Sequence, residues 1–442
     1  MLFSRNRVLW ASIALLCVAL LMAPALWNGF PLLQYDTGGY LARWFEGYLV
    51  PSRPGMYGLI LLAGAWGDFW PVLLLQAALT VWVLHLVLRA HGLARPWMLF
   101  GVVAALCLFT TLPWLSAILL TDIFCGLGVL GLYLLLMRGE TLRHCERFGL
   151  IALIAVSGAT HSATYAVFLG LLAGAMVWHT RPGSSITLAG LRDAIVACVL
   201  GALATFAANF TVSGQFAWTP GGAALSFGRM LQDGIVTRYL DDRCPDARLQ
   251  LCDYKTQLPL DADAFFWGNP IFIKLGRFAG LGKEMQTIAV EAVTAYPLLQ
   301  LKSVVLDTSK QIVDVRTGEG VLDTIWHTYA IVAHYTPGAL PAMKAARQQR
   351  GELSFAAINR LHYPLALIAI LMLPTLIVVC RTRRLAAVRD LALAMSIAVL
   401  ANAAVCGVFS NPHDRYGARI AWLASLTVLI ALATALRPAR VD

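Results

Sequence analysis

Apolar residues gather in long runs along most of the chain, and polar residues are confined to the stretches between these runs. An apolar run of about twenty residues matches the hydrocarbon thickness of a bilayer when it forms a helix. The pattern therefore predicts membrane-spanning helices. Eight such runs lie at 8–27, 70–90, 97–115, 121–137, 193–212, 361–380, 390–409 and 419–436.

A ninth apolar stretch, from Phe148 to Trp178, is too long for one ordinary span and is interrupted by Thr160-His161-Ser162. A single crossing there would place the arginines near Arg389 on the opposite side of the membrane from Arg7. Two short helices that meet at His161 keep these basic residues on one side. We therefore predict an all-α, polytopic membrane protein with about ten spans and both termini in the cytoplasm.

Composition and charge agree with this topology. The chain of 442 residues is 59% hydrophobic and 13% charged, against about 45–50% and about 25% for soluble domains, which excludes a soluble enzyme. With ten crossings, fifteen basic and five acidic residues face the cytoplasm, whereas the outer side has nineteen of each, so the net charge of +10 lies entirely inside. This is the positive-inside distribution of membrane proteins. It leaves no support for nucleic-acid binding.

The predicted spans divide the chain into three parts. Residues 1–212 form an N-terminal transmembrane module whose first outer loop covers 28–70, residues 213–360 form an outer-face segment, and residues 361–442 hold the C-terminal spans. In the first loop, Tyr40, Trp44 and Tyr48 recur at helical spacing and predict a helix in the headgroup layer. The apolar stretch from Met56 to Trp66 is too short to span and predicts a half-helix.

The outer-face segment lacks the alternating pattern of β-strands, so we expect a mainly helical cap packed on the outer membrane surface. Its clearest helix carries Leu301, Val305 and Ile312 on one face, with Lys302 and Asp307 away from it.

Only two of the nine cysteines, Cys244 and Cys252, share an outer loop. A disulfide between them would be permitted in an oxidising periplasm, and two free thiols are the alternative. No Cys and His spacing resembles a zinc site.

Four polar clusters are expected at the outer boundary, where the spans end. Ionisable groups that face the interior of a helix bundle are costly to keep and are therefore site candidates. The clusters are Asp36 with Tyr40 and Arg53; Asp122 at the start of a span; His161 at the break between two helices; and His413, Asp414, Arg415 and Tyr416 with Arg419.

Each cluster also has a purely structural alternative. Asp36 and Asp122 are ordinary residue types for a helix N-cap. Arg53 has the length to snorkel to the headgroups, and His161 has the small neighbours of a hydrogen-bonded core histidine. The segment from His413 to Tyr416 is also compatible with a solvated hairpin.

Arginine binds phosphate well through its planar guanidinium group, and a lipid-linked phosphate would lie at the depth of these clusters. A neighbouring carboxylate can take a proton from an incoming hydroxyl as a general base. The combination predicts group transfer from a phospholipid carrier to an alcohol, with Asp36 as the base and Arg53, Arg415 and Arg419 on the phosphate.

The first 210 residues resemble membrane-integral glycosyltransferases of the GT-C fold, which use polyprenyl-phosphate-linked sugars. The resemblance rests on the acidic loop Tyr35-Asp36-Thr37-Gly38-Gly39-Tyr40, the half-helix Arg53-Pro54-Gly55-Met56-Tyr57, the segment Leu119-Leu120-Thr121-Asp122 and the broken pair at His161. It implies that Asp36 is the catalytic base, or a metal ligand in members that use a divalent ion. It also implies a role for Tyr57 and Asp122 at the substrate site.

The leading hypothesis is therefore a bacterial inner-membrane glycosyltransferase with its active site facing the periplasm. It would move a sugar from a polyprenyl-phosphate donor to an envelope glycan or lipid, with membrane lipids around it. The alternatives are a non-enzymatic flippase for a lipid-linked glycan, and a transferase or polymerase of another lipid-carried group. A flippase would place charge along its spans, whereas here the charges lie at the span ends.

Overall fold

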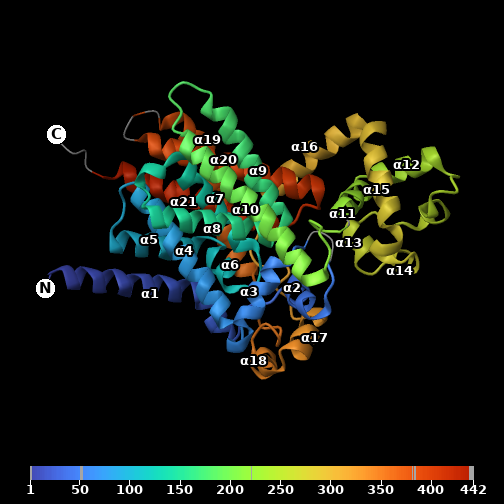
Figure 1. Cartoon of the computed structure of the whole chain (residues 1–442), viewed down its shortest axis with the longest axis horizontal. Coiled ribbons are helices and arrows are strands. Elements are labelled where there is room, and N and C mark those ends of the chain that lie inside the picture. The colour runs from blue at the N-terminus through green and yellow to red at the C-terminus, as the bar shows by residue number, and fades with distance from the viewer. Residues whose placement is uncertain (1, 50–52, 221, 381, 383–384, 438–442) are drawn as a thin grey trace.

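The computed structural model describes residues 2–49, 53–220, 222–380, 382 and 385–437, and only the backbone of 2–5, 222 and 223. Arg381, Arg383, Arg384, Arg440 and Asp442, which entered the charge count, lie outside these residues. Within the described part the chain is helical, and its β-type contact is an isolated parallel bridge between Leu32 and Ile118. Figure 1 shows that α1 begins and α21 ends at one end of the long axis, opposite a lobe made by α11–α15.

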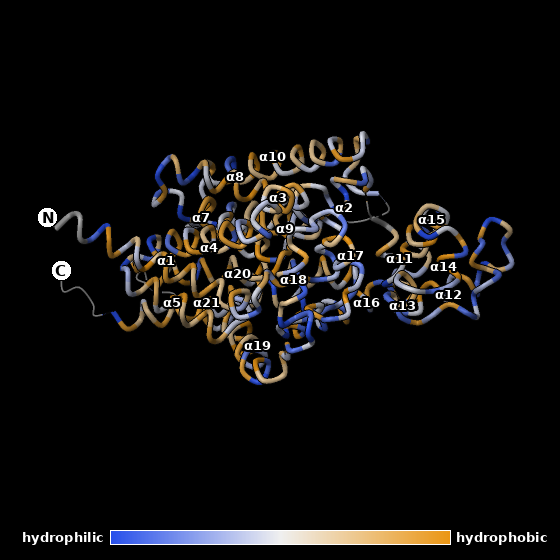
Figure 2. The backbone as a smooth tube through the Cα atoms, turned by 90° about the horizontal axis from the view of Figure 1, so that it is seen from below, coloured by the Kyte–Doolittle hydropathy of each residue, from blue (hydrophilic) through white to orange (hydrophobic). Residues whose placement is uncertain are grey.

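Ten helices lie at the predicted crossings. Seven of them, α1, α4, α9, α10, α19, α20 and α21, are long and apolar enough to span a membrane, and Figure 2 shows the hydrophobic stretches that run along the body they form. The molecule is thus a polytopic helical membrane protein. The ten are α1 (Leu2–Asn28), α4 (Trp70–Ala90), α5 (Pro96–Phe109), α7 (Asp122–Met137), α8 (His144–Thr160), α9 (Ser162–His179), α10 (Leu188–Ser213), α19 (Ala356–Val379), α20 (Ala386–Phe409) and α21 (Asp414–Ala435).

The break at His161 is confirmed. His161 has extended backbone angles, φ −156° and ψ 126°, between the end of α8 and the start of α9. Short elements connect the body helices: α2 (Tyr35–Glu46), α3 (Met56–Gly64), η1 (Ala65–Gly67), α6 (Leu112–Ala117) and η2 (Gly139–Thr141).

The predicted aromatic face of α2 is wrong in two respects. Gly47 adopts φ 70° and ends the helix at Glu46, so Tyr48 lies beyond it. Tyr40 is 1% exposed and its ring packs edge to face on Tyr57 with centroids 5.4 Å apart, so the ring is packed inside the protein and is not available to lipid headgroups. This face of α2 turns inward because α3 folds back against it.

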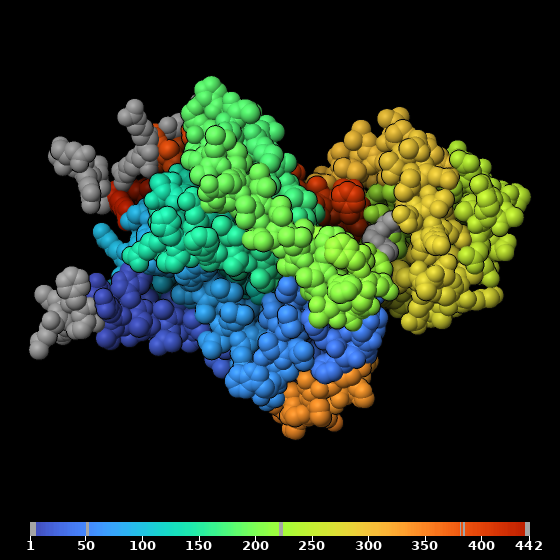
Figure 3. Space-filling view, in the orientation of Figure 1, coloured from blue at the N-terminus to red at the C-terminus, as the bar shows by residue number. Residues whose placement is uncertain are grey.

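The segment 213–360 is helical, as predicted, but only part of it forms a separate cap. That lobe, set beside the body in Figure 3, has its own hydrophobic cluster around Phe227, Leu240 and Met285. It comprises α11 (Gly222–Gln232), α12 (Ile235–Arg243), η3 (Gln250–Gln257), α13 (Ala262–Phe266), α14 (Pro270–Lys274) and α15 (Arg277–Ala295).

The predicted disulfide between Cys244 and Cys252 is present in this lobe. The chain then returns to the body, where α17 packs against α2. The returning elements are α16 (Pro297–Val313), α17 (Trp326–Tyr335), η4 (Pro337–Ala339) and α18 (Leu340–Ala345).

Helix α16 buries its polar face. Ser303, Asp307 and Gln311 are each at most 9% exposed, whereas Leu301 and Val305 are 59% and 57% exposed. The polar face is buried because it meets polar partners: Ser303 donates a hydrogen bond to Asp233 at 2.8 Å. Hydrophobic periodicity locates such a helix correctly and yet does not tell which face is packed.

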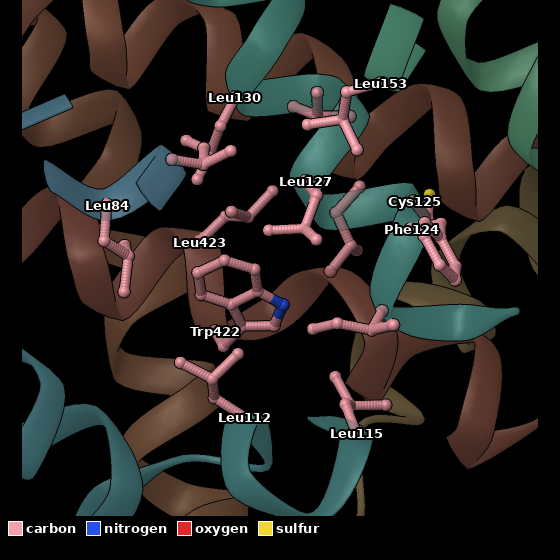
Figure 4. Packing of buried hydrophobic residues seen from close by; sticks show 14 of the residues in the cluster. Leu84, Leu112, Leu115, Phe124, Cys125, Leu127, Leu130, Leu153, Trp422 and Leu423 are labelled. Carbon is pink, nitrogen blue, oxygen red and sulfur yellow. The ribbon is translucent and has the colours of Figure 1, made fainter. Parts of the chain in front are cut away.

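The packing of α7 on α21 positions the polar residues that these two helices carry. Figure 4 shows Trp422 of α21 among Leu112, Leu115 and Leu127. A Cβ atom on Gly126 would lie 2.7 Å from the Trp422 ring, so only glycine permits this approach. The close contact aligns the first turn of α7, which carries Asp122, with the part of α21 that carries Arg419.

The packing of α2 on α3 leads to a first prediction. A Cβ atom on Gly58 would lie 2.2 Å from the Tyr40 carbonyl oxygen and 2.5 Å from the Trp44 ring. Because a backbone group cannot move without its helix, we expect Gly58→Ala to displace α2 and to destabilise the protein by about 1–3 kcal/mol in thermal unfolding.

The matched control is Gly101→Ala in α5, where the added Cβ meets nothing within 4 Å. Equal melting temperatures for the two variants would contradict the predicted clash at Gly58.

Candidate active site

Asp36 stands in the first turn of α2, and its carboxylate is not used to cap that helix. The N-cap is Gln34, whose Oε1 accepts a hydrogen bond from the Asp36 amide at 2.8 Å. Thr37 ties the same turn to the body by donating to the Leu119 carbonyl at 2.8 Å. The backbone is therefore held by Gln34 and Thr37, which leaves the Asp36 side chain free for other partners.

Those partners are two arginines from distant parts of the chain. Arg53 forms an ion pair with one carboxylate oxygen of Asp36, and Arg415 Nη1 donates to the other at 2.9 Å. Burial alone would raise the pKa of Asp36, but Arg53 and Arg415 outweigh burial and lower this pKa to about 2. Arg53 is thus a partner of Asp36 and does not only snorkel to the headgroups.

Arg415 also joins Asp36 to Asp122. Its Nε donates to Asp122 Oδ2 at 2.7 Å, and Arg419 Nη1 lies 3.8 Å from Asp122 Oδ1. Asp122 is 1% exposed and Arg419 is fully buried. The three arginines of this network exceed its two aspartates by one positive charge.

His161 supports Arg419 from the break between α8 and α9. Its Nδ1 lies 3.3 Å from Arg419 Nη1, while Asn402 Oδ1 accepts from Arg419 Nε at 2.9 Å and from Nη2 at 2.8 Å. A guanidinium group only donates, so Nδ1 must be the acceptor and the proton lies on Nε2. His161 is thereby a hydrogen-bonded interior histidine that holds Arg419 in place.

Tyr57 and Tyr416 lie around this network without pairing with its carboxylates. The Tyr57 hydroxyl donates to Gln76 Oε1 at 3.1 Å, so this residue fixes the wall behind Tyr40. The Tyr416 ring lies 5.4 Å from the Arg415 guanidinium and 5.5 Å from that of Arg419. Stacking of this kind orients the two guanidinium planes.

The start of α21 is held by Glu319, a residue that the sequence interpretation missed. Glu319 Oε2 accepts from the Arg415 amide at 2.6 Å, and Oε1 lies 2.8 Å from His413 Nδ1. Glu319 stands between Gly318 and Gly320, both at positive φ. A carboxylate between two glycines in a loop is the sequence signal that could have indicated it.

Asp414 pairs with Arg316, which is not a partner of Asp36. It accepts from the Arg316 amide at 2.8 Å and lies 3.7 Å from Arg316 Nη1, so it ties α21 to the loop after α16. The structure therefore brings together Asp36, Arg53, Asp122, Arg415 and Arg419, with Tyr40, His161 and Tyr416 beside them. Tyr57 and Asp414 lie behind or outside this group, and His413 lies at its outer rim.

A cleft with apolar walls opens beside Arg415. The cleft is open to solvent on one side. Arg415 and Asp122 both line this cleft, and among the described atoms Arg415 Nη2 and Asp122 Oδ1 are buried without a hydrogen-bond partner. The lining residues include Leu32, Trp114, Leu115, Ile118, Leu120, Val321 and Phe355, with Asp122, Arg316, Glu319 and Arg415 at the polar end.

The carboxylates of this site do not fit a divalent metal ion. Asp36 and Asp122 both bind arginine, and no group of three His, Cys, Asp or Glu residues suited to a metal occurs in the described part of the chain. The guanidinium groups of Arg53 and Arg415 occupy the positions beside these carboxylates that a cation would need.

Comparisons of the chain with protein families, with curated proteins and with solved structures find no match.

The contact between His413 and Glu319 predicts a pH dependence. Burial would lower the pKa of His413, but Glu319 outweighs it and raises this pKa above its ordinary 6.5; His413 in turn lowers the pKa of Glu319 below 4.5 against the effect of burial. The histidine contribution is complete below 6.5 and is lost as pH rises through the raised pKa. The glutamate contribution is complete above 4.5 and is lost on acidification.

We therefore expect the start of α21 to be held best between pH 4.5 and 6.5. Amide hydrogen exchange at 413–417, corrected for the intrinsic rate, should show weaker protection at about pH 8. His413→Gln, which cannot be protonated, should remove this difference. An unchanged pH dependence in that variant would assign the effect to another group.

Proposed function

We propose that the protein is a glycosyltransferase that moves a sugar from a polyprenyl-phosphate-linked donor to an envelope glycan or lipid on the outer face of a bacterial inner membrane. The observation that carries the proposal is that Arg415, which lines an apolar cleft, keeps its Nη2 group buried without a hydrogen-bond partner. Such a cleft suits a ligand with a hydrocarbon chain and an anionic head.

Charge supports a phosphate as that head. Arg53, Arg415 and Arg419 exceed Asp36 and Asp122 by one positive charge, and the free Nη2 group can donate two hydrogen bonds to phosphate oxygens. The apolar lining from Leu32 to Phe355 would receive the first prenyl units. This division of the cleft would place the sugar, which is bonded to the phosphate, next to Asp36.

Phosphate binding would also activate Asp36. With a pKa of about 2, Asp36 is a weak base while both arginines hold it. A phosphate that shares Arg53 and Arg415 weakens their hold on the carboxylate and raises its pKa toward the range useful for proton transfer. The base would thus become effective only when donor is bound, which limits transfer of the sugar to water.

In the proposed step, the acceptor hydroxyl oxygen attacks the anomeric carbon of the donor sugar and its proton passes to Asp36. The bond between that carbon and the phosphate oxygen breaks, and polyprenyl phosphate leaves with the bonding electrons. Arg415 stabilises the charge that develops on the leaving oxygen. The products are the glycosylated acceptor and the lipid phosphate, and Asp36 then releases the proton to water.

The predicted topology supports an outer-face site. Ten crossings would place both termini and the basic excess in the cytoplasm, and α1 and α21 do begin and end at the same end of the molecule, opposite the cap (Figure 1). The disulfide in the cap suits a periplasmic location. The order of the acidic loop, the half-helix and the broken helix pair, which resembles GT-C enzymes, adds to this support.

The experiment that tests the proposal is mass spectrometry of envelope glycans and polyprenyl-linked lipids from cells with and without the gene. Loss of one hexose or pentose from a glycan, with accumulation of its lipid-linked form, is expected. Flux of a lipid-linked glycan across sealed vesicles, without any covalent product, would favour the flippase alternative.

A further inference from the structure

The cap places two side chains against the proposed active site. Arg53, which pairs with Asp36, lies with its guanidinium carbon 5.8 Å from the centre of the Trp267 ring. Trp267 Nε1 donates to Asp263 Oδ1 at 3.2 Å, and Asp263 Oδ2 lies 3.4 Å from His413 Nε2. Both cap residues come from α13 or from the position directly after it.

These contacts form a closed ring. From Asp36 the contacts pass through Arg53, Trp267, Asp263, His413 and Glu319, and they return through Arg415 to Asp36. The core supplies five of these seven residues and the cap supplies two. A group that binds at Trp267 and Asp263 is therefore held at the rim of the site that contains Asp36.

Exposure distinguishes these cap residues from packing residues. Trp267 is 58% exposed, whereas the preceding Phe265 and Phe266 are 0% and 7% exposed in the cap core. One exposed tryptophan on a surface needs no explanation. This one, however, adjoins the arginine bound to Asp36, and the Asp263 side chain next to it is 48% exposed.

We propose that Trp267 and Asp263, with His413 and Glu319, form a saccharide-binding subsite for the acceptor. The apolar face of a sugar ring can pack on the indole, and its hydroxyl groups can donate to the two carboxylates. The inference rests on the proposed function and names its acceptor as a glycan that enters from the aqueous side. The donor chain would occupy the apolar cleft beside Arg415, and Glu319, which lines the polar end of that cleft, would adjoin both substrates.

The test uses the full-length protein in nanodiscs and the soluble glycan pool released from envelopes of cells that lack the gene. Binding is measured by calorimetry without donor, so no chemistry is required. We expect Trp267→Ala to weaken binding about tenfold or more and Trp267→Phe to retain most of it. Tyr254→Ala is the matched control, because the ring of this cap aromatic packs against the ammonium group of Lys274, which is not one of the seven residues in the ring of contacts.

Wild-type affinity in Trp267→Ala would overturn the subsite, and so would an equal loss in Tyr254→Ala, since that result would assign the effect to folding of the cap. Failure of the proposed function gives a different result. If glycan binding depends on Trp267 but Asp36→Asn leaves envelope glycans unchanged, the subsite stands and the transferase assignment fails.

Discussion

Replacing Asp36 by Asn should reduce sugar transfer by roughly a hundredfold to ten-thousandfold, the range that a general base contributes. The amide keeps the size of the side chain but cannot take the proton of the acceptor hydroxyl. The effect should fall on kcat, because Arg415 remains available to bind the donor phosphate. The measurement is transfer by purified protein from lipid extracts enriched in the donor, with donor binding followed separately.

Folding provides the necessary control for this variant. Asp36 is half-buried between Arg53 and Arg415, so the loss of its charge leaves these arginines less compensated and should lower the melting temperature modestly. Asp241→Asn is the matched control, because Asp241 lies in the cap and is 57% exposed in its pair with Lys255. A folded Asp36→Asn protein that transfers sugar at the wild-type rate would exclude Asp36 as the base.

The pH profile gives a second test of Asp36. If donor phosphate loosens the hold of Arg53 and Arg415, the acidic limb of kcat should lie well above the folded-state pKa of about 2. In free enzyme, the same carboxylate stays ionised down to that pKa. A limb of kcat near pH 2 would contradict donor-dependent activation of Asp36.

Periodicity and length were sufficient to predict the helical body. Each of the predicted crossings corresponds to a helix, and seven of these helices are long and apolar enough to span a membrane. The break at His161 also followed from sequence, since the polar run Thr160-His161-Ser162 interrupts an otherwise apolar stretch. Burial was harder to predict, because sequence alone does not tell which helix face meets protein and which meets lipid.

Helix α16 and the cap illustrate that limit. The buried side of α16 is polar, since Asp307 and Ser303 meet partners on α11 and directly after it, about seventy positions earlier in the chain. Trp267 and Asp263 of the cap could not be assigned to the site for the same reason. Their contact with Arg53 and His413 depends on how the cap folds back, which no local pattern specifies.

The acidic and basic residues at the outer ends of spans were easier to predict. Asp36, Asp122 and Arg415 were grouped because each stands where an apolar run ends, and the structure shows that one guanidinium group binds both carboxylates. Asp122 is not the N-cap residue of α7, which was the structural alternative for it. The helix begins at Asp122 itself, and Thr121 occupies the N-cap position. The distances between these residues in the chain, 293 and 379 positions, explain why their partners could not be named beforehand.

Arg415 should be the residue least tolerant of change. Arg415→Ala leaves Asp122, which is 1% exposed, with Arg419 Nη1 at 3.8 Å as its nearest cation. Breaking a buried ion pair in this way costs about 3–5 kcal/mol. Unfolding in detergent should show this loss, and the double variant with Asp122→Asn should recover part of it by removing the unpaired charge.

Activity should not return with stability in that double variant, since the phosphate would still lack its donor. Arg415→Lys separates the two effects further. Lysine keeps the positive charge but has a single ammonium group. It cannot bind both Asp36 and Asp122 and also donate a pair of N–H groups to the phosphate. We expect transfer to fall roughly a hundredfold to a thousandfold with folding largely retained.

The control for Arg415→Lys is Arg238→Lys, an exposed cap residue paired with Asp242, which should transfer sugar normally. Measuring donor affinity distinguishes a phosphate-binding role of Arg415 from a purely structural one. A phosphate ligand requires weaker donor binding in Arg415→Lys, whereas a purely structural role requires loss of stability alone. Wild-type donor affinity and rate in a folded Arg415→Lys protein would leave the free Nη2 group without function, and the assignment of the apolar cleft to a lipid phosphate would fail with it.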